Sequence, residues 1–333
     1  MAESGMDRNA VKAQLAAIRP QMMAMFADQR KDIAVCGEEM ELSLEDGRRQ
    51  MLHYPSGKEK APVYIDVHGG GFTWGTIADG DHFCREVSHT FGWEAYAVDY
   101  PLTPDAEYPA QLYWVYETIC YMRDHAEQLH IDPDCMIIGG RSAGANLAAA
   151  LCLLAKAKGE FQFAAQVLDH PWLDLCGLVG WSAGERYLGE GALTQEVMMG
   201  LAWGYADLLQ LQEILCSPLA ASKEELAFLP PAVIQTCELD SLRPEGELYA
   251  RHLEEAGVMV RYHCMEGAAH GFTESETPIG EQGRQWLIRQ LAEMMTRQQG
   301  KWKSGMMGPM AHHSSQTSLL SQRVHVDGGW DTM

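Results

Sequence analysis

Residues 135–144 read Cys-Met-Ile-Ile-Gly-Gly-Arg-Ser-Ala-Gly, a short apolar run that ends in the pattern G-x-S-x-G. The run predicts a buried strand over 135–140, and the Ala- and Leu-rich residues 143–158 predict the helix that follows. A serine on a tight turn between a strand and a helix is exposed to substrate and lies near the positive end of the helix dipole. Glycines two positions before and after the serine avoid a steric clash in such a turn. The stretch therefore predicts an α/β sheet with Ser142 as a nucleophile, although a chance Gly/Ser turn would explain this stretch alone.

Strands and helices alternate on both sides of this turn. Apolar runs rich in β-branched residues occur near 33–44, 48–54, 62–68, 94–100, 135–140, 164–169, 231–237 and 258–265. Apolar residues recur at helical spacing between some of these runs, as in 109–125 and 243–256. The alternation predicts a mostly parallel, eight-stranded sheet with helices on both faces. Hydrophobic residues make up 47% of the chain, which is enough for a large core.

Three segments fall outside the alternation. Residues 1–32 and 176–216 carry bulky apolar side chains and no convincing strand, and we expect them to form a helical cap; ordinary core packing against the sheet is the alternative. The predicted core is then 33–175 and 217–299. Residues 300–333 show no periodicity and are expected to be a mobile tail.

A second motif, His68-Gly69-Gly70-Gly71, follows the expected strand near 62–68. Backbone N–H groups can approach a developing oxyanion only where no Cβ holds the substrate away. A phosphate-binding loop is the alternative, but such a loop needs a lysine and a helix start, and Phe72-Thr73-Trp74 offers neither. The glycine loop therefore predicts an oxyanion hole.

An acid and a base follow in chain order. Asp240 comes after the expected strand 231–237, and His270 comes after the strand 258–265, so both are expected at the carboxyl edge of the sheet. Nucleophile, acid and base in this order are typical of α/β-hydrolases. Glu238 is the alternative acid, and Asp240 can also cap the helix that begins near Arg243.

With these motifs the chain resembles the hormone-sensitive-lipase family of esterases over roughly residues 40–295. Further similar segments are Val98-Asp99-Tyr100-Pro101-Leu102-Thr103-Pro104, Tyr108-Pro109-Ala110-Gln111-Leu112, His170-Pro171-Trp172-Leu173-Asp174 and Leu239-Asp240-Ser241-Leu242-Arg243. The resemblance implies an α/β-hydrolase fold with a helical cap built from the two segments named above. It also implies that Gly70, Gly71 and Ala143 donate N–H groups to the oxyanion, and that His68 braces the glycine loop without a catalytic role.

The chain departs from the family at two positions beside the nucleophile. The family usually has Asp where this chain has Arg141, and Gly where it has Ala145. Neither position belongs to the nucleophile, acid or base, so we expect the chemistry to survive. Arg141 nevertheless changes the charge close to the site and can alter substrate preference.

Charge and composition restrict the substrates, partners and location that can be expected. A formal net charge of −21 disfavours nucleic acids and anionic lipid surfaces as partners, so a small neutral ester is the expected substrate. No apolar run approaches the roughly 20 residues needed for a membrane span. Residues 1–10 do not resemble a secretory signal, and the nine scattered cysteines have no C-x-x-C pair, which favours reduced thiols in a cytoplasmic protein. The histidines show no metal-ligand spacing, so no metal or organic cofactor is expected.

The predicted function is therefore a serine carboxylesterase that hydrolyses short-chain neutral esters through an acyl-enzyme. An amidase or formamidase with the same triad is one alternative, and a non-catalytic small-molecule receptor is another. The expected strand 258–265 can serve as an edge strand for a homodimer.

Overall fold

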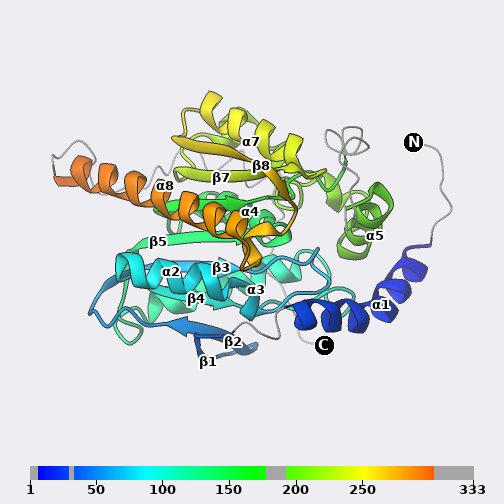
Figure 1. Ribbon diagram of the computed structural model, residues 1–333, viewed down its shortest axis with the longest axis horizontal. Helices are drawn as coiled ribbons and strands as arrows, with labels where there is room; N and C mark the ends of the chain where they lie inside the picture. The colour runs from blue at the N-terminus through cyan, green and yellow to red at the C-terminus, as the bar shows by residue number, and fades with distance from the viewer. Residues whose placement is uncertain (1–6, 30–33, 178–192, 304–333) are drawn as a thin grey trace.

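The computed structural model describes residues 7–29, 34–177 and 193–303, and its elements alternate along the chain as the sequence predicts (Figure 1). The α-helices are α1 (Arg8–Gln29), α2 (Asp81–Phe91), α3 (Ala110–Asp124), α4 (Ala143–Lys158), α5 (Gln195–Tyr205), α6 (Lys223–Leu226), α7 (Arg243–Glu255) and α8 (Pro278–Lys303). The strands are β1 (Glu38–Leu44), β2 (Gly47–Tyr54), β3 (Ala61–Val67), β4 (Glu94–Val98), β5 (Ile131–Arg141), β6 (Ala165–Asp169), β7 (Ala232–Leu239) and β8 (Val260–Ala269). The short 3₁₀ helices are η1 (Ile77–Gly80), η3 (Gln210–Gln212), η4 (Pro218–Ala220) and η5 (Phe272–Glu274).

The strands form one eight-stranded sheet in the order β1-β2-β4-β3-β5-β6-β7-β8. The pairs β1/β2 and β2/β4 are antiparallel. All pairs from β4 to β8 are parallel. Each of the eight predicted strands is therefore present, and the prediction of a mostly parallel sheet is confirmed. Strand β8 lies at the edge of the sheet, as expected for the run 258–265.

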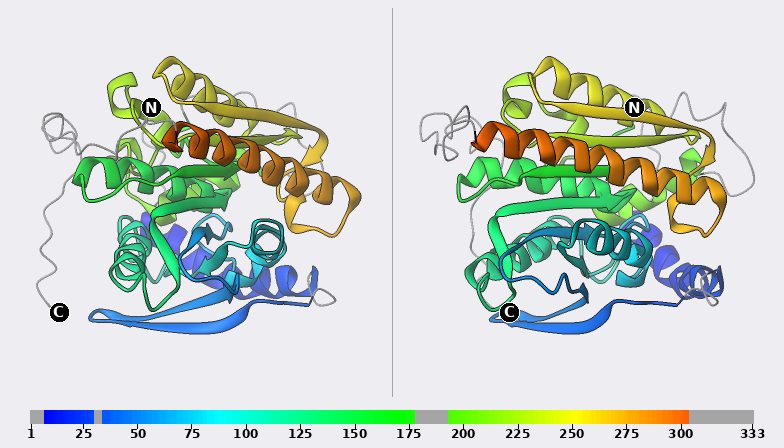
Figure 2. Two further views of the ribbon diagram at one scale, coloured as in Figure 1. Left: turned by 90° about the vertical axis from the view of Figure 1, so that its left-hand side faces the viewer. Right: turned by 60° about the vertical axis from the view of Figure 1, so that its left-hand side comes forward.

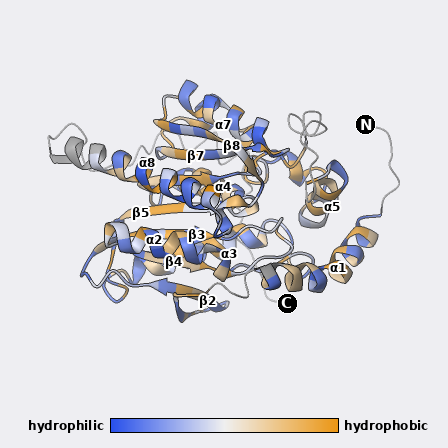
Figure 3. Ribbon diagram, viewed as in Figure 1, coloured by the Kyte–Doolittle hydropathy of each residue, from blue (hydrophilic) through white to orange (hydrophobic). Residues whose placement is uncertain are grey.

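Helices cover both faces of the sheet, as Figure 2 shows. On one face, α2 and α8 bury Phe83, Val87, Leu287 and Leu291 in a common core. On the other face lie α3, α4 and α7. Helix α4 is buried on nearly every side, and its apolar composition is visible in Figure 3, as expected for a helix enclosed by a sheet and other helices. None of the helices in the described ranges is both long enough and apolar enough to cross a membrane.

The two predicted cap segments contact each other beside the sheet. Helix α1 packs on α5, and a Cβ added to Gly204 would lie only 2.2 Å from Cδ1 of Leu15. Nε of Arg8 donates a hydrogen bond of 2.8 Å to the carbonyl of Trp203. Figure 1 shows both helices beyond the carboxyl ends of the parallel strands. Residues 178–192 of the expected cap insertion, including Trp181 and Tyr187, lie outside the described residues, as does the tail beyond Lys303.

Candidate active site

Ser142 occupies a tight turn between β5 and α4. Its backbone angles, φ 54° and ψ −118°, fall in a region that non-glycine residues rarely adopt. The turn is held by hydrogen bonds, since the N–H of Ser142 donates to the carbonyl of Asp169 over 3.0 Å. A Cβ on Gly140 would lie 2.6 Å from the carbonyl oxygen of Val67, and one on Gly144 would lie 2.0 Å from the same oxygen. This close packing confirms the steric reason predicted for the two glycines.

The structure brings Ser142, His270 and Asp240 together in one chain of contacts. Nε2 of His270 lies 2.9 Å from Oγ of Ser142, and Nδ1 of His270 lies 2.7 Å from Oδ2 of Asp240. Ser142 and Asp240 are buried, while the His270 side chain is 20% exposed. In this geometry the imidazole can accept a proton from the serine while the carboxylate orients the ring.

The second oxygen of Asp240 is also engaged. Oδ1 accepts a hydrogen bond of 3.0 Å from the N–H of Leu242, the residue before α7. Leu242 is the N-cap of α7 and no side chain caps this helix, so the predicted capping role of Asp240 is not found. Burial would raise the pKa of Asp240, but the charge and hydrogen bond of His270, together with the Leu242 N–H, lower it below the usual range. Glu238, the alternative acid, accepts a hydrogen bond of 2.7 Å from the N–H of Gly267.

The glycine loop adopts backbone angles that favour glycine. Gly70 has φ 100° and Gly71 has φ 58°. A Cβ on Gly70 would lie 2.1 Å from the carbonyl oxygen of Trp74, and one on Gly71 would lie 2.7 Å from Cδ1 of Leu201. Among the described residues, no backbone carbonyl accepts a hydrogen bond from the N–H of Gly70, Gly71 or Ala143. These three groups can therefore donate to a substrate oxygen.

His68 lies under the glycine loop, where it contacts the loop backbone. Its Nδ1 is 2.8 Å from the carbonyl oxygen of Gly69, and its ring stacks on Tyr100 with centroids 4.1 Å apart. The hydroxyl of Tyr100 donates to the carbonyls of His68 and Gly69 over 3.0 and 3.2 Å. Sequence reasoning missed this role of Tyr100, although the residue lies in a segment, 98–104, that carries the family resemblance.

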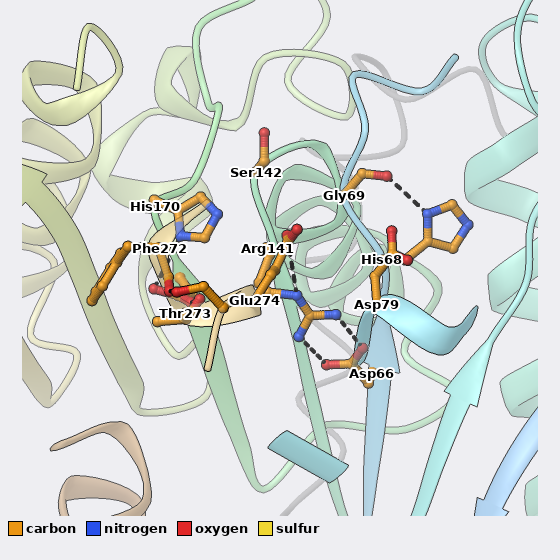
Figure 4. A network of polar contacts seen from close by, with 12 residues as sticks. Asp66, His68, Gly69, Asp79, Arg141, Ser142, His170, Phe272, Thr273 and Glu274 are labelled. Atoms are coloured by element: carbon orange, nitrogen blue, oxygen red, sulfur yellow. Dashed lines mark hydrogen bonds and ion pairs between the residues drawn. The ribbon is translucent and has the colours of Figure 1, made fainter. Parts of the chain in front are cut away.

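Arg141 points away from the nucleophile and forms a buried ion pair (Figure 4). Its guanidinium donates two hydrogen bonds, of 3.0 and 2.7 Å, to the carboxylate of Asp66. Burial would lower the pKa of Arg141, but Asp66, its hydrogen bonds and Glu274 raise it above the ordinary value, so the side chain is charged. Asp66 was also missed, although an acidic residue inside the apolar strand 61–67 was a signal. The other departure from the family, Ala145, is fully buried in α4.

A second buried charge pair, Asp169 and His170, follows β6. Nδ1 of His170 lies 3.2 Å from Oδ1 of Asp169, within ion-pair distance. Asp169 accepts hydrogen bonds from Gln235 over 3.0 Å and from the hydroxyl of Thr273. Burial would raise the pKa of Asp169, but the charge of His170 and the hydrogen bonds of Thr273 and Gln235 lower it. Burial would lower the pKa of His170, but the adjacent carboxylate raises it above that of a free imidazole.

Helix α5 contacts two of the loops that form the site. Leu201 lies against Gly71 of the glycine loop, as the clash of an added Cβ shows. Sδ of Met198 lies 3.7 Å from the hydroxyl of Ser241, the residue after Asp240. The predicted cap segment therefore reaches both the candidate oxyanion donors and the loop of the candidate acid.

No candidate metal site is found among the described residues. Within the described ranges, no three His, Cys, Asp or Glu residues are grouped so that they could hold a metal ion. All nine cysteines lie in these ranges, and all are free thiols. The site therefore offers a nucleophile, a base, an acid and hydrogen-bond donors from the chain itself.

Comparison with known proteins gives consistent matches. A family model described as alpha/beta hydrolase fold matches residues 64–274. An arylesterase of Saccharolobus solfataricus is 33% identical over 240 residues, which cover 71% of this chain and 77% of that protein. The carboxylic ester hydrolase LipN of Mycobacterium tuberculosis is 31% identical over 280 residues, 80% of this chain and 73% of that protein. The crystal structure of EstE1, a thermostable carboxylesterase from a metagenomic library, superposes with a TM-score of 0.75 at 26% identity, covering 88% of this chain and 99% of that one. The predicted α/β-hydrolase fold is thereby confirmed.

Proposed function

Since the chain belongs to the alpha/beta hydrolase fold family and is a carboxylic ester hydrolase, we propose that it cleaves small, neutral, short-chain esters with Ser142 as its nucleophile. The observation that carries the proposal is the placement of His270 between Oγ of Ser142 and the carboxylate of Asp240, at 2.9 and 2.7 Å. The net charge of −21 supports a neutral substrate, because an anionic one would be repelled.

Acylation begins when Oγ of Ser142 attacks the ester carbonyl carbon. As the new bond forms, Nε2 of His270 takes the serine proton, and Asp240 stabilises the resulting imidazolium. Negative charge then develops on the former carbonyl oxygen. The N–H groups of Gly70, Gly71 and Ala143 stabilise this oxyanion, which they can do because none of them donates to a backbone carbonyl of a described residue.

The tetrahedral intermediate breaks down in the second half of acylation. The carbon–oxygen bond to the alcohol breaks, and Nε2 of His270 returns its proton to the leaving oxygen. A water molecule then attacks the acyl-enzyme with His270 as general base. Cleavage of the bond to Oγ releases the carboxylic acid and restores Ser142 with its proton.

The short-chain preference is proposed from the position of the cap. We propose that residues 1–32 and 176–216 together limit the room for the acyl chain. The contacts of Leu201 with Gly71 and of Met198 with Ser241 support this proposal, because both bring α5 to the loops around the reacting carbon. Each methylene that fits such a pocket contributes about 0.8 kcal/mol, and each one that does not fit contributes nothing.

We also propose that the protein can form a homodimer and that it is located in the cytoplasm. The position of β8 at the sheet edge supports pairing with a second copy of the chain, since an edge strand presents unpaired N–H and C=O groups. The nine free thiols support a reducing compartment such as the cytoplasm.

Hydrolysis of a panel of nitrophenyl esters and aryl amides by the purified protein tests the function. We expect turnover of short-chain esters that is lost in Ser142→Ala. Turnover confined to the amides would favour an amidase instead. Tight binding of small neutral ligands without turnover of any ester would favour a receptor and contradict the proposal.

A further inference from the structure

Arg141 lies next to three segments of the candidate site: the turn of Ser142, the strand before the glycine loop and the loop that follows His270. Arg141 directly precedes Ser142, and its guanidinium is hydrogen-bonded to Asp66 on β3, two residues before His68 of the glycine loop. Its Nε lies 3.6 Å from Oε1 of Glu274, in the 3₁₀ helix η5 that follows His270. Figure 4 shows Arg141 between Asp66 and the segment of Thr273 and Glu274. Arg141 therefore lies between three segments: its own turn with Ser142, strand β3 that leads into the glycine loop, and η5 after His270.

The environment of this cation makes its position well defined. The side chains of Arg141 and Asp66 are 5% and 0% exposed, and two parallel hydrogen bonds fix the guanidinium plane. Glu274 is 23% exposed, so it closes the ion pair at its outer side. A buried ion pair is weak evidence for stability, because desolvation offsets much of its attraction. The placement of this pair between three functional loops points to a different role.

The loop that carries His270 is held in place by contacts with residues outside the loop. Gly271 follows His270 with φ 80°, and a Cβ added there would meet no atom within 4 Å, so the space on that side of the backbone is open. The next residues are anchored, since Phe272 is buried in a small apolar cluster and Thr273 and Ser275 take part in hydrogen bonds. The hydroxyl of Thr273 donates to the Asp169 carboxylate, and Nη1 of Arg284 donates to the carbonyls of Thr273 and Ser275 over 2.7 and 2.8 Å.

We propose that Arg141 is a positioning residue, which acts through Glu274 and Asp66 to hold the His270 loop in register with Ser142 and the glycine loop. This inference rests on the proposed function. Its physical basis is that a displacement of about 1 Å between reacting groups can reduce the rate roughly 100-fold. The residue that departs from the family pattern next to the nucleophile thereby has a defined part in the site.

The first test removes the charge of Glu274, which lies on the outer side of the buried ion pair. Glu274→Gln keeps the shape of the side chain and removes its charge. We expect kcat for a short-chain ester to fall about tenfold while KM changes less than about twofold, because the geometry of proton transfer is disturbed and substrate binding is not. The matched control is Glu276→Gln, an acidic residue of the same segment whose side chain is 62% exposed and contacts His82, at 3.6 Å, instead of Arg141. The control should retain the wild-type kcat, and a wild-type kcat in Glu274→Gln would overturn the proposal.

A double-mutant cycle tests whether the effect passes through Arg141. The buried pair is replaced by a neutral one, Arg141→Gln with Asp66→Asn, and Glu274→Gln is then added to that background. If Glu274 acts through Arg141, the added substitution has no further effect on kcat. A second full tenfold loss would show that Glu274 acts independently and would overturn the proposal.

If the variant with Arg141→Gln and Asp66→Asn does not fold, amide hydrogen exchange in Glu274→Gln provides an independent test. In Glu274→Gln, the amides of residues 271–275 should exchange faster than in the wild-type protein, and those in Glu276→Gln should not. Unchanged exchange in Glu274→Gln would overturn the proposal. Failure of the proposed function would give a different result from failure of this inference. In that case the wild-type protein would turn over no ester, or Ser142→Ala would remain active.

Discussion

The imidazole ring of His170 packs edge to face against the ring of His270, with centroids 4.6 Å apart and an interplanar angle of 80°. His170 is fully buried and held next to the Asp169 carboxylate. The proposed base is therefore packed against a second histidine while its two nitrogens contact Ser142 and Asp240. This contact restricts rotation of the His270 ring. The proposed mechanism requires the ring to stay in one orientation, with Nε2 toward Ser142 and Nδ1 toward Asp240.

Replacement of His170 should change how stability depends on pH. Asp169 outweighs burial and raises the folded-state pKa of His170 above the unfolded value of about 6.5. The resulting stabilisation is fully present below about pH 6.5 and is lost as the pH rises through the folded-state value. In urea unfolding, the free-energy difference between wild type and His170→Gln should therefore be largest near pH 6 and should shrink as the pH rises. A difference that stays constant would contradict the raised pKa, and His89→Gln, an exposed position on α2, is the control.

Ser142→Ala should abolish ester hydrolysis and leave the fold intact. Loss of a serine nucleophile removes on the order of 10⁴–10⁶ in kcat in comparable enzymes. Nitrophenyl ester assays measure the rate, and circular dichroism with thermal melting measures the fold. Ser88→Ala on α2, away from the site, should retain the wild-type rate. If Ser142→Ala kept more than about a tenth of that rate, another group would have to be the nucleophile.

Asp240→Asn should cost far more activity than Glu238→Gln. Asn in place of the acid favours the wrong imidazole tautomer, with an expected loss of about 10⁴ in kcat. Glu238→Gln removes only the carboxylate that accepts from the N–H of Gly267, outside the contacts of His270. The reverse ranking in a steady-state assay would transfer the acid role to Glu238.

The cap should set the preferred acyl length. We expect activity on a series of acyl esters to peak at about two to six acyl carbons. Leu201→Ala should move the peak to longer chains, because it removes the side chain packed on Gly71. Leu208→Ala, at a position that is 64% exposed, should leave the profile unchanged. Rates that rise steadily to long-chain esters in the wild type would mean that the cap does not restrict the site.

Removal of residues 1–32 tests the other cap segment. Helix α1 supports α5 through Leu15 and Arg8, so its loss should broaden or destroy the length preference. An unchanged profile in the truncated protein would show that this segment does not shape the acyl pocket. Circular dichroism of the truncated protein separates a change in the pocket from general unfolding.

The strands, the helices and the local geometry around the candidate site could be predicted from residue patterns. Apolar runs predicted all eight strands, and the runs are clearest for β3, β4 and β6, which are almost completely buried. The helix predicted over 143–158 is found as α4, Ala143–Lys158. The strained turn at Ser142 followed from glycines at 140 and 144. These features depend on neighbouring residues and can therefore be inferred from spacing.

Contacts between side chains that are distant in the sequence could not be predicted in this way. The pairing of Arg141 with Asp66 depends on the parallel register of β3 and β5, and sequence spacing does not encode that register. The contact of His170 with His270 joins two loops after different strands, and that of Leu201 with Gly71 depends on how α5 packs against the glycine loop. Such contacts arise from the summed packing of the whole core, so a local pattern can nominate a residue for the site but cannot assign its partner.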